Sequence, residues 1–131
     1  MATVRQMIEK AGFHNLNNRD KARYEEFWEV CRELRSYTKV DLNVDHAKSI
    51  ASHREAAITP DNLHLTLPLE NGNKGAKSAE RYSWEQQKHL LDAVWHLART
   101  NAELGLISTG QRAKFSKKPF DKLVRRLQAI W

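Results

Sequence analysis

Cysteine and long apolar runs are nearly absent from this chain of 131 residues. Its only cysteine, Cys31, excludes an internal disulfide and a zinc site built from several cysteines. No run approaches the ~18 apolar residues of a membrane span, and the N-terminal segment lacks the apolar stretch of a secretory signal peptide. A disulfide scaffold and a zinc finger are therefore excluded, and we expect no transmembrane span, no secretory signal peptide and a cytoplasmic location.

Acidic residues are scarce in one part of the chain only. The whole sequence has 22 Lys and Arg against 16 Asp and Glu, a net charge of +6. Residues 105–131 contain seven basic side chains and a single acid, Asp121, so the entire excess lies there. A local excess of this kind is typical of a nucleic-acid-binding surface or a basic tail.

Apolar residues are numerous enough for one folded domain. The chain is 40% hydrophobic and has four Trp, four Phe and three Tyr, which excludes a wholly disordered basic protein. Its length favours one domain that buries about two-thirds of its unfolded surface. We expect a single domain over 1–131, with N-terminal helices in 1–37, a core in 38–81, and C-terminal helices with a basic loop in 82–131.

Capping signals and apolar spacing predict four helices. A short one ends near Gly12, a second begins near Asn18, a long one ends at Gly105, and the last has Pro119 in its first turn. Two Ser/Thr-x-x-Gln pairs have the spacing of a capping box, Thr3 with Gln6 and Ser83 with Gln86. The second helix carries an apolar stripe expected to be core, formed by Tyr24, Phe27, Trp28, Cys31 and Leu34.

Two short segments alternate apolar and polar residues, which is typical of half-buried strands. The first covers residues 39–45 and the second residues 62–67, with a loop expected over 48–60. Residues 70–80 have helical spacing and predict a short helix with a basic, polar face. Because two strands are not stable alone, they must pack on the helices. The expected class is α+β and mostly helical.

Polar residues gather around these elements. Asp45 and His46 end the first strand, Asn62 opens the second, and Asn71 and Lys74 lie at the start of the short helix. Aspartate and asparagine oxygens are hard ligands suited to Mg²⁺ or Mn²⁺. A neutral histidine beside such an ion can deprotonate water.

Three alternatives stay open at this point. Strict alternation places Asp45 and His46 on opposite faces of a regular strand, so a strand end or a bulge is needed for both to serve one site. Asn73 competes with Asn71 as the ligand. His64 shares a strand face with Asn62, and it either lines the site or faces solvent.

In this order and spacing, Asp45-His46, Asn62-Leu63 and Asn71 with Lys74 resemble the HNH endonuclease family and its ββα-metal motif. The resemblance covers Val40 to Lys77, and the chain looks similar to zinc-free phage-type members. It implies a two-stranded β-hairpin plus a short helix, embedded in a mostly helical single domain.

The resemblance also implies roles in a one-metal hydrolysis of DNA. His46 would be the general base, Asp45 and Asn71 would hold the divalent ion, and Asn62 would brace the hairpin and orient His46. Lys74 would contact phosphate. Mg²⁺ is the expected ion, with Mn²⁺, Ni²⁺ and Zn²⁺ as alternatives, and the expected partner is double-stranded DNA.

Basic residues outside this motif are the candidates for holding DNA. Phe115, in the basic loop, either stacks on a base or pins that loop. A non-catalytic nucleic-acid-binding protein that keeps the hairpin as a scaffold, or an accessory nuclease subunit that needs a partner, is the alternative function. The predicted DNA-binding residues are Lys74, Lys77, Arg81, Arg112, Lys114, Lys117 and Lys118.

Overall fold

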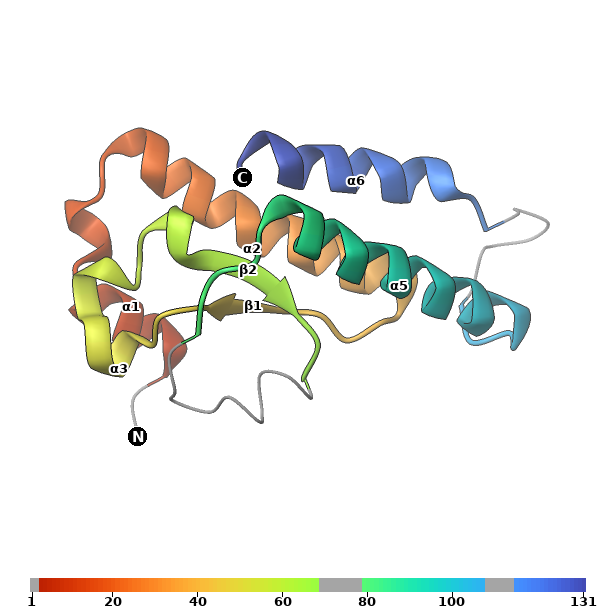
Figure 1. Cartoon of the computed structure of the whole chain (residues 1–131), viewed down its shortest axis with the longest axis horizontal. Coiled ribbons are helices and arrows are strands. Elements are labelled where there is room, and N and C mark those ends of the chain that lie inside the picture. The colour runs from red at the N-terminus through yellow and green to blue at the C-terminus, as the bar shows by residue number, and fades with distance from the viewer. Residues whose placement is uncertain (1–2, 69–78, 108–114) are drawn as a thin grey trace.

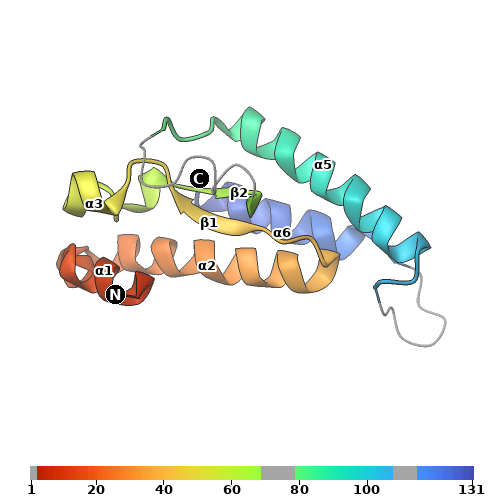
Figure 2. The same ribbon diagram turned by 90° about the horizontal axis from the view of Figure 1, so that it is seen from below.

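A two-stranded antiparallel hairpin lies between two long helices in the computed structural model, which describes residues 3–68, 79–107 and 115–131. Strand β1 (Asn43–His46) pairs with β2 (Leu63–Thr66), so that Val44 lies opposite Leu65. Helix α2 (Asn18–Thr38) packs on one side of the hairpin and α5 (Trp84–Glu103) on the other (Figure 1, Figure 2). Helix α6 (Lys117–Ala129) packs against α2 and α5. The expected α+β, mostly helical class is confirmed.

The helix boundaries follow the capping signals in the sequence. Helix α1 (Val4–Lys10) and α5 both begin with the predicted capping boxes. The amide N–H of Asp20 donates to Asn17, which caps α2. Gly105 has φ of 75° just after α5, a conformation that favours glycine. These four helix predictions are confirmed because caps and apolar spacing are local signals.

Three segments differ from the sequence-based prediction. Strand β1 begins at Asn43, because Lys39 adopts φ of 57° at the end of α2 and the chain is still turning. The expected loop over 48–60 contains a short helix, α3 (Ile50–His53), capped by Ser49. Helix α6 begins at Lys117, because Ser116 caps it two residues earlier than Pro119 suggests.

Strand β2 is buried on both of its faces, whereas alternation predicted one solvated face. His64 and Thr66 are buried, as are Leu63 and Leu65, the other two residues of the strand. The outer edge of the strand is closed by Gln87 of α5. Its Oε1 accepts from the Leu65 amide at 2.7 Å, and its Nε2 donates to the Leu65 carbonyl at 3.1 Å. A glutamine side chain thus replaces a third strand.

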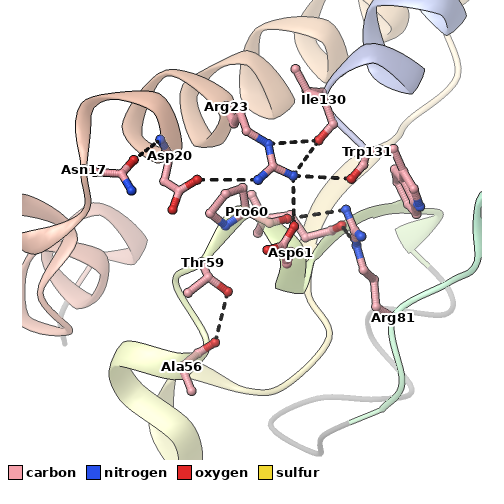
Figure 3. Close-up of polar contacts among 11 residues, drawn as sticks. Asn17, Asp20, Arg23, Ala56, Thr59, Pro60, Asp61, Arg81, Ile130 and Trp131 are labelled. Carbon is pink, nitrogen blue, oxygen red and sulfur yellow. Dashed lines mark hydrogen bonds and ion pairs between the residues drawn. The ribbon is translucent and has the colours of Figure 1, made fainter.

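Two arginines tie the start of β2 to the end of α6 (Figure 3). Arg23 of α2 donates to the carbonyl of Ile130 and to the carboxylate of Asp61, each at 2.9 Å. Arg81 donates from Nε to the carbonyl of Leu63 at 2.7 Å, and its guanidinium lies 3.9 Å from the centre of the Trp131 ring. The turn that leads into β2 is therefore held on both sides.

Candidate functional site

Asp45 and His64 form a buried pair across the hairpin. They are directly opposite in the strand register, and only 6% of Asp45 and 2% of His64 are exposed. The Nε2 atom of His64 lies 2.8 Å from Oδ2 of Asp45, while its Nδ1 accepts the Tyr82 amide hydrogen at 3.0 Å. Because Nδ1 accepts the Tyr82 amide hydrogen, Nε2 is the nitrogen that donates to Asp45. His64 is therefore buried against Asp45 rather than facing solvent.

His46 is held from the other side of the hairpin by Tyr24 of α2. The Tyr24 hydroxyl lies 2.6 Å from Nε2 of His46, and the two rings are 5.9 Å apart. Burial raises the pKa of Tyr24 well above its usual value, so this phenol stays neutral. Tyr24 can donate to Nε2, or accept from it when Nε2 carries the proton.

The strand is regular at this point, without the bulge that would turn both side chains one way. Each of Asn43, Val44, Asp45 and His46 has one partner in β2. Even so, Asp45 and His46 border one cavity of about 590 Å³ between α1, α2 and β1. The two side chains nevertheless have partners on opposite faces of the strand, since Asp45 contacts His64 across the hairpin and His46 contacts Tyr24 of α2.

Asn62 binds the chain on both sides of the connection between the strands. Its Oδ1 accepts from the amide of Lys48 at 2.8 Å, and its Nδ2 donates to the carbonyls of Lys48 at 3.0 Å and Ala57 at 2.7 Å. Its own carbonyl accepts from the amide of Ala47 at 2.9 Å. The backbone directly after His46 is therefore fixed by one buried asparagine.

Arg81 does not lie on a helical basic face. Residues 79–83 are not helical, and the half-buried guanidinium is engaged with Leu63 and Trp131. Burial lowers the pKa of Arg81 from its usual value. Arg81, predicted as a DNA-binding residue, thus has its planar group stacked on an indole and bonded to a backbone carbonyl.

The predicted DNA-binding residues near the C-terminus divide into two groups. Lys117 and Lys118 are exposed in the first turn of α6. Phe115 stacks between Tyr37 and Trp95, with ring centres 5.0 and 4.9 Å away, so it pins its segment to the core. The remaining site predictions lie outside the described residues: Asn71, Asn73, Lys74, Lys77, Arg112 and Lys114.

Sequence reasoning missed the roles of His64 and Tyr24. His64 lies opposite Asp45 in the strand register, but the long connection between the two strands means that no tight turn in the sequence fixes this pairing. Tyr24 was assigned to the core by its helical spacing. It is indeed buried, but nothing in the spacing shows that its hydroxyl reaches His46.

Comparison of the chain with protein-family models, with curated proteins and with solved structures yields no match. The resemblance to HNH endonucleases therefore depends on the residues themselves. Within the described ranges, no helix has the length and apolar character to cross a membrane.

The residues that would hold a divalent ion can be tested only in part. No group of three His, Cys, Asp or Glu side chains suited to a metal lies within residues 3–68, 79–107 and 115–131. Asp45 itself fits a ligand, because carboxylates that bind metals are commonly oriented by a hydrogen bond from a neighbouring group. His64 supplies that bond at 2.8 Å.

Proposed function

We propose that this protein is an HNH-type endonuclease that hydrolyses phosphodiester bonds of double-stranded DNA with a divalent ion, Mg²⁺ in the first place. The proposal names Asp45 and His46 as the reactive pair at the end of β1. Their order and spacing relative to Asn62, Asn71 and Lys74 are the basis for the family assignment.

The observation that carries the proposal is the set of hydrogen bonds made by Asn62. The side-chain amide of this buried asparagine forms hydrogen bonds to the backbone of Lys48 and Ala57 through both its oxygen and its nitrogen. These bonds stabilise one conformation of the chain that follows His46. Catalytic groups need such support, since a misplaced base loses much of its effect. The same residue is the brace that the family resemblance implies.

In the proposed reaction the base and the metal ligand have their partners on different faces of the hairpin. His46 takes a proton from the attacking water, and Tyr24 holds its ring through Nε2. Asp45, oriented by His64, and Asn71 would hold the ion, which supplies stabilisation of the charge that develops on the phosphate and the leaving oxygen. Lys74 would contact the phosphate.

A plasmid assay tests the activity. Supercoiled DNA is incubated with the protein and Mg²⁺ or Mn²⁺, with EDTA as one control and the His46→Ala variant beside the wild type. Loss of a general base lowers rates by about 10²–10⁴-fold, so nicking should nearly vanish in that variant and in EDTA. His89→Ala, an exposed histidine of α5, is the matched control and should cut normally.

Two results would contradict the proposal. Binding of DNA without metal-dependent nicking in any buffer would favour a non-catalytic nucleic-acid-binding protein. Unchanged nicking by His46→Ala would remove His46 as the base.

A further inference from the structure

The face of α2 next to β1 carries an exposed aromatic residue and two arginines. Trp28, Arg32 and Arg35 follow Tyr24 at intervals of four, four and three residues, which places them along one side of the helix. Trp28 was expected in the core, but 37% of it is exposed. Its ring lies 6.4 Å from the rings of both Tyr24 and His46.

These three residues line the same cavity as the proposed catalytic pair. The cavity of about 590 Å³ is bordered by Trp28, Arg32 and Arg35 from α2, and by Asp45 and His46 from β1. Its remaining wall includes Val4 and Met7 of α1 and the start of α3. A groove therefore leads from the arginines of α2 to the imidazole of His46.

The charges in this groove are available to an anionic ligand. Arg32 pairs with Glu29 of the preceding turn, but 67% and 46% of these side chains are exposed. Exposed pairs of this type contribute about 0–1 kcal/mol, so a phosphate can replace the glutamate. The acid within the groove, Asp45, is bound by His64 on the far side of the hairpin.

We infer that this groove binds the DNA strand that is to be cut, with phosphates on Arg32 and Arg35 and a nucleoside against Trp28. The inference depends on the proposed function, and it adds a substrate-binding surface separate from the basic C-terminal residues. Arginine forms paired hydrogen bonds with phosphate oxygens, and an exposed indole provides a face on which bases stack. A strand bound there has its backbone beside His46.

Binding is measured in EDTA, so that no cleavage intervenes, by fluorescence anisotropy of a labelled duplex and of its single strand. The groove variant is Arg32→Gln with Arg35→Gln. Two lost phosphate contacts should reduce the slope of log K against log salt by about 1.8 for the duplex and about 1.4 for the single strand. The matched control is Arg19→Gln with Arg99→Gln, two exposed arginines elsewhere on α2 and α5, which should leave the slope unchanged.

Trp28 is tested by two substitutions. Trp28→Ala should weaken binding by about 5- to 100-fold, the loss of one base–aromatic stack, and Trp28→Phe should restore most of it. Thermal melting of each variant separates lost contacts from lost folding.

The outcomes separate the two proposals. If the wild type cuts DNA and the arginine groove variant binds with the wild-type affinity and salt slope, the groove assignment is wrong and the nuclease assignment stands. If the wild type neither binds nor cuts, both are wrong.

Discussion

If His46 is the base of the proposed reaction, the contact of its Nε2 with the Tyr24 hydroxyl bears on which ring nitrogen takes the proton. If Nε2 carries the proton and donates to Tyr24, then Nδ1 is the ring nitrogen without a proton. When His46 becomes an imidazolium, the same hydroxyl oxygen, 2.6 Å away, accepts from the charged ring. In the proposed reaction Tyr24 would thus be a positioning residue, comparable to the aspartate that orients the histidine of a Ser-His-Asp triad.

Removing this hydroxyl should slow cleavage while leaving the fold and DNA affinity intact. Tyr24→Phe keeps the ring and loses a hydrogen bond worth about 0.5–1.5 kcal/mol, which corresponds to about a 2- to 12-fold lower rate. The measurements are the nicking rate as a function of pH, and the tautomer of His46 by nitrogen NMR. Tyr37→Phe is the matched control, because the Tyr37 hydroxyl bonds the Ser116 carbonyl far from the site. An unchanged rate, pH profile and tautomer in Tyr24→Phe would refute the role.

His64 orients Asp45 in a comparable way. Its two ring nitrogens are both engaged, one with the Tyr82 amide and the other with the carboxylate of Asp45. The two hydrogen bonds together fix the orientation of the His64 ring, and one of them holds an oxygen of Asp45.

The corresponding prediction concerns metal affinity. His64→Gln should weaken Mn²⁺ binding about 10- to 100-fold, the usual loss when a group that orients a metal ligand is changed. Isothermal titration measures this in the absence of DNA. The exposed His96 of α5 provides the control, since His96→Gln should bind Mn²⁺ like the wild type. Equal affinities in the two variants would show that Asp45 is not a ligand or does not need its partner.

At the scale of elements, the hairpin is held by side chains as much as by its own strands. Each strand has only four residues, too few for independent stability. Gln87 forms hydrogen bonds with the outer edge of β2, and Arg81 donates to the carbonyl of Leu63. Asn62 donates to the carbonyl of Ala57 in the segment that connects the two strands. Asn62 directly precedes β2, whereas Arg81 and Gln87 lie just before and within the first turn of α5.

Asn62 should therefore be important for folding as well as for the site. Asn62→Ala leaves the Lys48 amide and the Ala57 carbonyl without their partner, and each unsatisfied buried group costs about 1–3 kcal/mol. We expect a free energy of unfolding lower by about 2–4 kcal/mol in urea denaturation. Asn17→Ala, which removes an exposed helix cap, is the comparison and should cost about 1 kcal/mol. A loss for Asn62→Ala no larger than that would contradict the bracing role.

The sequence was sufficient to predict the parts of the fold that depend on local signals. Ser83 with Gln86 marks the start of α5, and Gly105 its end, because caps act within one turn. Helical spacing also places Gln87 on the buried face of α5, whereas the exposure of Trp28 and the hydrogen bonds of Gln87 to Leu65 were not predictable in this way. Both depend on which element packs against the residue, and periodicity along one helix carries no information about the neighbour.

The candidate site likewise combines residues predicted from the sequence with contacts that depend on tertiary packing. Asp45, His46 and Asn62 were recognised because their order along the chain is a pattern. Tyr24 lies more than twenty residues before His46, and its hydroxyl reaches the imidazole only because α2 packs on the hairpin. A contact of that kind appears in the tertiary structure alone.

At the scale of the whole molecule, the basic C-terminal region is partly neutralised by α2. Arg126 donates to Glu26 at 2.6 Å and to Glu33 at 2.5 Å, and these hydrogen bonds raise its pKa above the usual value. One of the seven basic residues after position 104 is thus used for packing α6 on α2. The exposed Lys117 and Lys118 remain candidates for phosphate contacts.

Two variants should separate these uses of positive charge. Changing Arg112, Lys114, Lys117 and Lys118 to Gln should weaken DNA binding and reduce the salt slope by up to about 3.6, if each makes one phosphate contact. The melting temperature should stay near that of the wild type, because Lys117 and Lys118 are exposed.

The second variant, Arg126→Gln, should lower the free energy of unfolding by about 1 kcal/mol and leave the salt slope of DNA binding nearly unchanged. Anisotropy titrations at several salt concentrations and thermal melts measure both. If the quadruple variant keeps the wild-type slope, the excess charge does not hold DNA, and the groove beside His46 would carry the electrostatic part of binding.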